Sequence, residues 1–357
     1  MSLTYTQYIN KAFDECLNDD PSVLLFGLGV GDIGAVFGST ANLQTKYGAD
    51  RVFEIPLSEN AATGMALGLA MQGFRPVMMH QRADFSFTSA EQIINQIAKT
   101  SYMSGDIYKI PLVIRMIVGR GWGQGPTHAQ SPHAIFSHIP GLQVVAPATP
   151  LEGYYLMKES INCDNPVIFI EHRWLHQTVE QSNNKLILPN IYKARIMKPG
   201  SDLTIISLSY GVIECLKIAE VLAELNLKVE VINLRSIQPW DINTVIQSVT
   251  KTKKVMLLDI GNIEFGLTGE ISSVIYTELF NFISHPILRF GLPMEPTPSS
   301  AALAIDHYPS IEKMLQKIKN HFGFNFEVEK AIEILVNKFP YKTKHRDQPD
   351  IGIIGPF

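Results

Sequence analysis

Residues 54–73 read E-I-P-L-S-E-N-A-A-T-G-M-A-L-G-L-A-M-Q-G. The apolar residues at 52–57 predict a short buried strand, in which Pro56 fits only near the end. Ser58 is a favourable N-cap, and the small and helix-forming residues after it predict a helix that stops at Gly73. Small or apolar residues occupy nearly every side of this helix, so we expect it to be buried.

Glu59 lies in the first turn of this predicted helix. A buried carboxylate is unfavourable unless a hydrogen-bond donor or a positive charge compensates it. The helix dipole alone is one sufficient explanation for an acid at this position. A bound group that contacts the carboxylate is the other explanation, and the surrounding motifs bear on the choice.

The composition is that of an ordinary globular protein with two or three domains. The chain has 357 residues, of which 46% are hydrophobic and 18% are charged. A net charge of −4 without a basic run gives no indication of nucleic-acid binding, and no apolar run is long enough to span a membrane. Scattered cysteines and an N-terminus without a signal or transit pattern lead us to expect a cytoplasmic protein.

Strand and helix signals alternate along the chain, which predicts α/β layers around mainly parallel sheets. The predicted strands are 23–26, 76–79, 111–118, 142–146, 167–170, 203–208, 229–234 and 254–259. The predicted helices are 5–17, 88–103, 151–161, 212–225, 242–249 and 268–279. Residues 172–200 are polar and irregular, and we place a domain linker there. The predicted domains are 1–185 and 186–325, followed by a C-terminal helix and tail at 326–357.

Residues 29–34 read G-V-G-D-I-G and follow the predicted strand 23–26. They fit the dinucleotide-binding pattern G-x-G-x-x-G, and Glu54 lies about twenty residues further on, as that pattern requires. The next residues, 35–44, predict only a weak helix, whereas a dinucleotide site needs a firm helix N-terminus for the pyrophosphate. Nicotinamide or flavin binding is therefore the weaker interpretation.

Several further segments support another interpretation. They read R-V-F-E-I-P-L-S-E-N at 51–60, G-L-A-M-Q-G-F-R-P-V at 68–77, Q-R-A-D-F at 81–85, Q-I-I-N-Q-I-A-K-T-S-Y-M-S-G at 92–105, T-H-A-Q-S at 127–131, H-I-P-G-L-Q-V-V-A-P-A-T-P at 138–150, D-N-P-V-I-F-I-E-H at 164–172 and V-I-N-L-R-S-I-Q-P-W-D at 231–241. In this order the chain resembles the beta subunit of the thiamine-diphosphate-dependent 2-oxoacid dehydrogenases, the decarboxylating component of the pyruvate and branched-chain complexes. The resemblance implies two doubly wound α/β domains, a pyrimidine-binding domain followed by a transketolase C-terminal-like domain.

The resemblance implies roles for five side chains. Glu59 would meet a ring nitrogen of the cofactor's pyrimidine and promote the tautomer that activates the cofactor. Phe85 and Leu57 would lie against that ring, with plain core packing as the alternative, and Gln81 would bond to its amino group. His128, in a glycine-rich loop, would hold the substrate carboxylate or acyl intermediate and the incoming lipoyl group.

The resemblance also implies partners, because part of the family's cofactor site is missing. In the family a G-D-G…N-N motif holds the diphosphate and magnesium, but here Gly31-Asp32 is followed by Ile33 and no paired Asn lies at the needed distance. We expect thiamine diphosphate to be shared with an alpha subunit, which holds most of the magnesium shell. The expected assembly is an α2β2 heterotetramer with a beta–beta dimer, and a lipoyl acyltransferase core is a further expected partner.

Several positions depart from the family. Leu28 and Met79 replace acids, and Arg82 replaces an apolar residue, where it could bind an anionic substrate or be solvated. His80 is not a family position, and we expect it to have a surface or packing role. The family's structural potassium site, formed largely by backbone carbonyls and with Cys163 in place of an Asp, corresponds here to Leu112, Ser160, Cys163 and Asn165.

Three functions remain open at this point. The first is oxidative decarboxylation of a 2-oxoacid with acyl transfer to a lipoyl group, as the beta subunit of a heteromeric enzyme. The second is carboligation or ketol transfer by a specialised paralogue with its own alpha subunit, as in a split transketolase. The third is a non-catalytic assembly role, against which the presence of Glu59, Phe85 and His128 argues.

Overall fold

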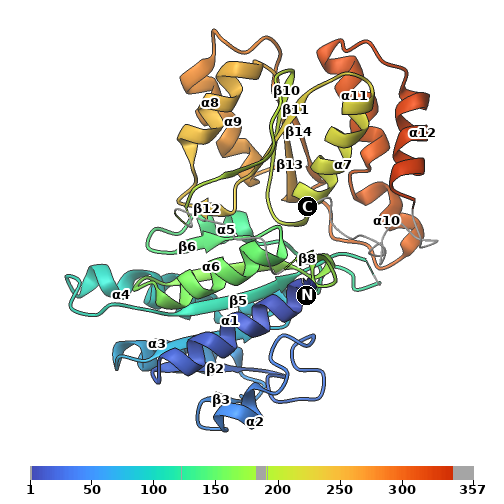
Figure 1. Ribbon diagram of the computed structural model, residues 1–357. Coiled ribbons are helices and arrows are strands. Elements are labelled where there is room, and N and C mark those ends of the chain that lie inside the picture. Colours follow the sequence, from blue (N-terminus) through green and yellow to red (C-terminus); the bar gives the residue numbers. More distant parts are fainter. Residues whose placement is uncertain (1, 122, 182–189, 191, 341–357) are drawn as a thin grey trace. The chain divides into compact units, whose positions relative to one another are not determined.

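The computed structural model describes residues 2–121, 123–181, 190 and 192–340. The chain divides into two compact units (Figure 1). The first unit contains Met1–Gly119, His128–Ile191 and Ile237–Pro239, and the second contains Arg120–Thr127, Tyr192–Ser236 and Trp240–Phe357. The expected boundary between residues 185 and 186 lies outside the described residues. The boundary at 326 stays a prediction, and the helix after it is grouped with the second unit.

The first unit is built on a seven-stranded sheet with the order β12-β6-β7-β5-β4-β2-β3. Its strands are β2 Val23–Gly27, β3 Val52–Phe53, β4 Arg75–His80, β5 Val113–Val118, β6 Gln143–Val145, β7 Val167–His172 and β12 Ser236–Gln238. The pairs from β6 to β3 are parallel, with Leu25 opposite Val77 between β2 and β4. Every residue of β2, β5 and β7 is buried, because helices cover both faces of a parallel sheet.

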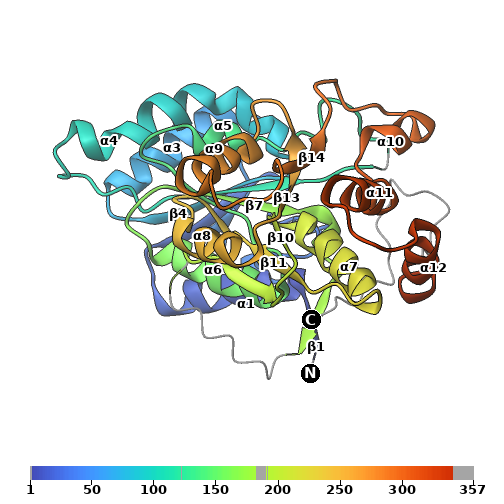
Figure 2. The ribbon, with the colours of Figure 1, turned by 90° about the horizontal axis from the view of Figure 1, so that it is seen from above.

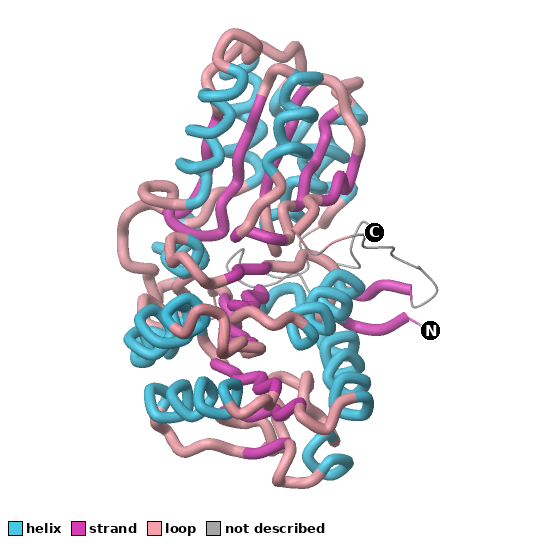
Figure 3. Tube along the Cα trace, turned by 90° about the vertical axis from the view of Figure 1, so that its left-hand side faces the viewer, coloured by secondary structure: helices cyan, strands magenta, loops and turns pink. Residues whose placement is uncertain are grey.

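Helices lie on both sides of this sheet (Figure 3). They are α1 Tyr5–Asp19, α2 Leu43–Tyr47, α3 Glu59–Met71, α4 Ala98–Met103, α5 His133–Ser137 and α6 Pro150–Asn162. The α1 helix begins with a capping box, in which the Thr4 side chain accepts from the Gln7 amide and the Gln7 side chain accepts from the Thr4 amide. The α6 helix begins with a Thr149 cap and Pro150 at its first position, and it packs against α1.

The second unit is built on a five-stranded sheet with the order β14-β13-β10-β11-β9. Its strands are β9 Arg195–Lys198, β10 Leu203–Ser207, β11 Val229–Asn233, β13 Val255–Asn262 and β14 Leu288–Leu292. All pairs are parallel except β9 with β11. Its helices are α7 Tyr210–Glu224, α8 Ile242–Thr252, α9 Leu267–Leu279, α10 Ala301–His307, α11 Ile311–Phe322 and α12 Val328–Lys338. The α7 helix packs against β10 and β11 (Figure 2).

The structure corrects three predictions of secondary structure. The predicted linker 172–200 contains the 3-10 helix η3 Arg173–Leu175 and the strand β8 Val179–Gln181, which pairs antiparallel with β1 Ser2–Thr4, as well as β9. The single helix predicted at 88–103 is divided into the 3-10 helix η1 Ala83–Ser89, the π-helix η2 Gln92–Ile97 and α4. The strand predicted at 52–57 ends at Phe53. Within the described ranges, the model has no helix with the length and apolar character needed to cross a bilayer.

Candidate active site

The predicted site residues lie at the carboxyl edge of the seven-stranded sheet. Leu57 and Glu59 follow β3, whereas Gln81 and Phe85 follow β4. Both strands are parallel neighbours of β2, so these segments leave the sheet at the same edge. The chain continues from β2 to β3 on one side and then to β4 on the other. The strand order therefore reverses at β2, and open α/β sheets bind ligands at the carboxyl edge beside such a reversal.

The glycine-rich loop after β2 is held by two side chains from the ends of the neighbouring strands. The Glu54 carboxylate accepts hydrogen bonds from the backbone amides of Gly29 and Gly31, at 2.8 and 2.5 Å. The Gln81 Nε2 atom donates to the carbonyl oxygen of Leu28 at 2.8 Å. Residues 28–42 form turns, and α2 begins only at residue 43. The loop therefore offers a pyrophosphate neither unoccupied amides at these glycines nor a helix N-terminus, and dinucleotide binding has no site here.

Helix α3 is less buried than its composition predicts. It packs by one stripe against β4, η1 and η2, and its remaining sides lie at the surface of this chain. The buried residues are Ala62, Thr63, Ala66 and Ala70. The expectation of burial on all sides is therefore wrong for this chain, because small side chains indicate close packing without saying which side is covered.

Glu59 is half-buried at the start of α3. Within residues 2–121, 123–181 and 192–340, no side chain or amide is hydrogen-bonded to its carboxylate. Ser58 precedes the helix but makes no side-chain cap; its Oγ donates to Asn60 Oδ1 at 3.1 Å. The Glu59 carboxylate therefore stays available to a ligand at the positive end of the helix dipole.

Leu57 is 79% exposed, so core packing does not explain this apolar side chain. Phe85 is half-buried in η1 and meets His128 edge to face, with ring centroids 5.4 Å apart and planes at 85°. His128 itself is exposed in this chain. The structure thus brings together two of the predicted site residues, and it packs α3 against the 3-10 helix that carries Phe85.

Asp84 and Gln130 fix the two segments that carry Phe85 and His128. Asp84 is buried, and its Oδ1 accepts from the backbone amide of Gln130 at 3.3 Å and from its Nε2 at 2.8 Å. Neither residue was predicted as a site residue. The only sequence signal for them is that they lie in the family segments Q-R-A-D-F and T-H-A-Q-S.

The loop that precedes His128 is anchored in the second unit. Arg120 donates from Nη2 to Glu214 Oε1 at 2.9 Å. Its guanidinium also lies over the rings of Tyr210 and Tyr308, at 5.7 and 4.7 Å from their centroids. These ionic and aromatic contacts attach Arg120 to the packed interior of that unit.

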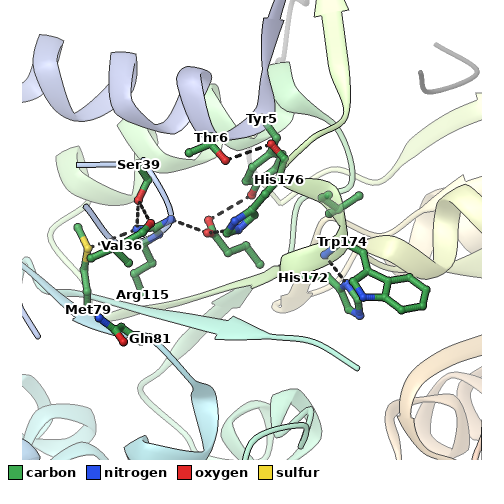
Figure 4. Close-up of polar contacts among 12 residues, drawn as sticks. Tyr5, Thr6, Val36, Ser39, Met79, Gln81, Arg115, His172, Trp174 and His176 are labelled. Carbon is green, nitrogen blue, oxygen red and sulfur yellow. Dashed lines mark hydrogen bonds and ion pairs between the residues drawn. The ribbon is translucent and has the colours of Figure 1, made fainter. Parts of the chain in front are cut away.

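A buried ionic cluster joins β5, β7 and the loop after β2 (Figure 4). Arg115 donates from Nη2 to Glu171 Oε1 at 2.5 Å and from Nη1 to Ser39 Oγ at 2.7 Å. His176 Nε2 lies 2.8 Å from the same carboxylate oxygen, and the Tyr5 hydroxyl donates to the other at 3.4 Å. Burial by itself raises the pKa of Glu171, but Arg115 and His176 outweigh it and lower the pKa to about 2.

Met79 contacts this cluster through its sulfur atom, which lies 3.3 Å from Arg115 Nη1. The resemblance leads us to expect an acid at the Met79 position, but the carboxylate beside Arg115 in this structure is that of Glu171. Glu171 supplies the carboxylate that the buried Arg115 needs. Burial lowers the pKa of His176 although Glu171 raises it, so the ring is neutral at pH 7.

The expected potassium ligands are Leu112, Ser160, Cys163 and Asn165. Arg75 donates from Nη1 to the carbonyl oxygens of Ile161 and Cys163, at 3.1 and 3.2 Å. The carbonyl oxygen of Leu112 accepts from the backbone amide of Val167 at 2.9 Å. Arg75 thus occupies the carbonyl of Cys163, whereas the Oγ of Ser160 is buried without a hydrogen-bond partner among the described residues. The potassium site stays a prediction.

Two family models match the chain. The model described as transketolase, pyrimidine binding domain matches residues 1–178, and that described as transketolase, C-terminal domain matches residues 192–314. The pyruvate dehydrogenase E1 component subunit beta-1, mitochondrial, of Oryza sativa subsp. japonica is 34% identical over 322 residues, which cover 89% of this chain and 86% of that protein. This chain belongs to the pyruvate dehydrogenase E1 beta-subunit family. The sequence resemblance and the expected fold class are thereby confirmed.

Further comparisons support the assignment of this chain to the E1 beta-subunit family. The pyruvate dehydrogenase E1 component subunit beta of Leifsonia xyli subsp. xyli is 34% identical over 329 residues, covering 90% of this chain and 96% of that protein. A solved structure titled "Split gene transketolase, inactive beta4 tetramer" has a TM-score of 0.73 and covers 90% of this chain and 98% of its own. Because its identity is 18%, this likeness shows the shared fold alone.

His80 makes the stability of this E1 beta-type chain sensitive to acid. It is 2% exposed at the end of β4, and its Nε2 has no hydrogen-bond partner among the described residues. Burial lowers its pKa from 6.5 to about 4. The unfolded chain therefore takes up the proton first, so this contribution to stability is present above pH 6.5 and is lost as the pH falls towards 4.

We expect His80→Phe to remove this loss, which amounts to about 1 kcal/mol per pH unit. Urea unfolding at several values between about pH 7.5 and about pH 4.5 measures it. The variant should lose less stability on acidification than the wild type. If the free energy of unfolding falls equally steeply with pH in the two proteins, the assignment to His80 is contradicted.

Proposed function

We propose that this chain is the beta subunit of a heteromeric thiamine-diphosphate-dependent 2-oxoacid dehydrogenase. The complete enzyme would oxidatively decarboxylate a 2-oxoacid and transfer the acyl group to a lipoyl group. Family membership over most of the chain supports the enzyme class. The observation that most directly supports the proposed site concerns the Glu59 carboxylate. It has no hydrogen-bond partner in the described chain, and it lies at the carboxyl edge of a parallel sheet.

The residues at this edge fit the pyrimidine half of thiamine diphosphate. The nitrogen of the Gln81 amide donates to the carbonyl oxygen of Leu28. The amide oxygen has no hydrogen-bond donor among the described residues and would accept from the cofactor's amino group. Glu59 would hold the proton at the pyrimidine ring nitrogen. Phe85 and Leu57, neither of them fully buried, would lie against the ring. When bound, thiamine diphosphate stabilises the negative charge that decarboxylation leaves on carbon.

His128 would act on the substrate side of the site. Its exposed imidazole can reach another molecule, and the edge-to-face contact with Phe85 restrains the ring. We propose that it holds the substrate carboxylate or the acyl intermediate and the incoming lipoyl group. The hydrogen bonds from Gln130 to Asp84 would keep the histidine segment beside Phe85 while these groups exchange.

The assembly is part of the proposal. We propose a cytoplasmic α2β2 heterotetramer with a beta–beta dimer, in which the alpha subunit holds magnesium and the diphosphate, and a lipoyl acyltransferase core as a further partner. The motif that would bind a metal-linked diphosphate is incomplete here, and the Gly29 and Gly31 amides already bind Glu54. This chain would therefore supply the pyrimidine half of a shared site.

Co-expression with a candidate alpha subunit tests the function. We expect the purified complex, supplied with thiamine diphosphate and magnesium, to reduce an artificial electron acceptor when a 2-oxoacid is added. Product analysis with an aldehyde acceptor distinguishes the carboligation alternative, which the curated relatives do not favour. A stable complex that transfers ketol units and oxidises no 2-oxoacid would contradict the proposal. A complex with no activity would support an assembly role instead.

A further inference from the structure

Two arginines meet at one aromatic ring on the carboxyl edge of the first unit's sheet. The guanidinium carbon of Arg82 lies 5.2 Å from the ring centroid of Phe37, and that of Arg173 lies 4.3 Å from the same centroid. Arg82 follows β4, Arg173 follows β7, and Phe37 lies in the loop after β2. Three loops at the ligand-binding edge of the sheet therefore converge on one point.

Neither arginine forms an ion pair within the part of the chain that the structure describes. The one side-chain hydrogen bond of Arg82 runs from Nη1 to the carbonyl oxygen of Gln81, at 3.0 Å. Two carboxylates lie near the arginines. Asp84 accepts from Gln130 through Oδ1 and favours the charged form of Arg82 without forming an ion pair with it, whereas Glu171 binds Arg115 and His176. The region around Phe37, where Arg82 and Arg173 meet, thus has an excess of positive charge.

This charge is unfavourable for the folded chain in the absence of an anion. Both guanidinium groups are half-buried, and arginines in such positions are usually paired with acids. Burial lowers the pKa of Arg82, and burial together with the charge of Arg82 lowers the pKa of Arg173. The two cations therefore disfavour each other across the ring that they share.

The backbone that holds Phe37 is also unusual. Ala35, Val36 and Phe37 have positive φ angles of 45°, 42° and 61° in succession. Such a conformation is costly for residues other than glycine, most of all for the β-branched Val36. It places the Phe37 ring against His176, with centroids 5.8 Å apart, as well as against the two arginines.

We propose that Arg82, Arg173 and Phe37 form a binding site for a carboxylate or phosphate group of a small-molecule ligand. Two guanidinium groups offer several N–H donors to an oxyanion, and charge-assisted bonds of this kind are strong. Arg82 directly follows Gln81, which we assigned to the cofactor, so the anion would lie at the same edge of the sheet as the proposed active site. On the basis of the proposed function, the ligand is a 2-oxoacid substrate with a second anionic group.

The first test is anion binding by the complete chain. Succinate and inorganic phosphate are titrated separately, by calorimetry at constant ionic strength, into the wild type and into Arg82→Gln and Arg173→Gln. We expect each variant to bind at least about tenfold more weakly, because each loses a charge-assisted contact. The control is Lys109→Gln, which removes an exposed charge of the same unit and should bind as the wild type does. Equal binding by all four proteins, or no binding by the wild type, would overturn the site.

A second readout separates binding from a structural role. In a low-salt buffer without carboxylate or phosphate, either glutamine variant should melt at the same temperature as the wild type or higher, because a repelling charge is gone. Succinate should raise the Tm of the wild type more than that of either variant. Variants that melt well below the wild type and still show its full Tm increase with succinate would overturn the proposal.

The assembled enzyme identifies the source of the anion. If the substrate carries it, Arg173→Gln should lower kcat/KM for a dicarboxylic 2-oxoacid by at least about tenfold relative to a monocarboxylic one. An unchanged ratio would overturn the assignment to the substrate, even if succinate binding is lost. An enzyme that oxidises no 2-oxoacid would contradict the proposed function, whereas the anion titration of this chain would stand independently.

Discussion

In a complex reconstituted with its alpha subunit, Glu59→Ala should lower kcat by about 10²- to 10⁴-fold, the range for loss of a general acid–base group. The proposed role requires a carboxylate that exchanges a proton with the pyrimidine ring. Glu59 suits this role because its carboxylate has no hydrogen-bond partner within the described chain. Steady-state assays with one 2-oxoacid and an artificial electron acceptor measure the effect.

Two further variants make this experiment specific. Glu59→Gln keeps the size of the side chain but removes the proton exchange, so it should be impaired nearly as much as the alanine variant. Glu91→Gln alters an exposed acid of the same unit and should retain normal kcat. A Glu59→Ala complex with wild-type turnover would refute the catalytic assignment, provided that the complex still binds thiamine diphosphate.

Glu171→Gln should destabilise the first unit by about 3–5 kcal/mol, because it leaves the Arg115 guanidinium buried without its counter-charge. The Arg115 and Glu171 side chains are only 1% and 0% exposed, and they meet at 2.5 Å. Arg115→Met should have an effect of similar size, since it leaves the carboxylate uncompensated. The free energy of unfolding in urea, measured near pH 7, gives the loss.

Two control variants distinguish the loss of the Arg115–Glu171 ion pair from a general loss of stability. The double variant Arg115→Met with Glu171→Leu should lose less stability than the sum of the two single changes, because neither charge is left alone. Lys313→Gln removes a partner from an exposed pair with Asp306 and should change stability by no more than about 1 kcal/mol. Additive losses in the double variant would show that the two charges are not coupled.

The central strands could be predicted from the sequence because their apolar runs are continuous. The predicted strands 23–26 and 167–170 correspond to β2 and β7, which extend one and two residues further. The short strands β8 and β9 could not be predicted, because they pair at the edges of their sheets and have no long apolar run. The π-helix η2 could not be predicted either, because its residues are as common in ordinary α-helices.

The extent of burial of α3 could not be predicted from its composition. Glycine and alanine permit close packing on any side, and only the fold shows that the covered stripe includes Ala62 and Ala66. The candidate site was predicted better, because its segments carry family motifs. The contact between Phe85 and His128 joins two of those motifs.

The contacts among the charged groups around the site could not be predicted from the sequence. Arg82 was recognised as unusual, but its meeting with Arg173 at Phe37 depends on three loops that are far apart in sequence. In the same way, the departure from the family pattern at Met79 was visible in the sequence, whereas the contacts of Arg115 with Met79 and Glu171 were not. Pairings of this kind are set by the order of strands in the sheet, and no local motif encodes them.

The central claim is that this chain supplies half of a thiamine diphosphate site, with Glu59 at the pyrimidine. Calorimetric titration of thiamine diphosphate with magnesium into the isolated chain, the isolated alpha subunit and their complex tests it most directly. We predict saturable binding, with about one cofactor per αβ pair, by the complex and none by this chain alone. Binding should be weaker for the Glu59→Ala complex. Tight binding by the isolated chain, or no binding by a stable complex, would contradict the account.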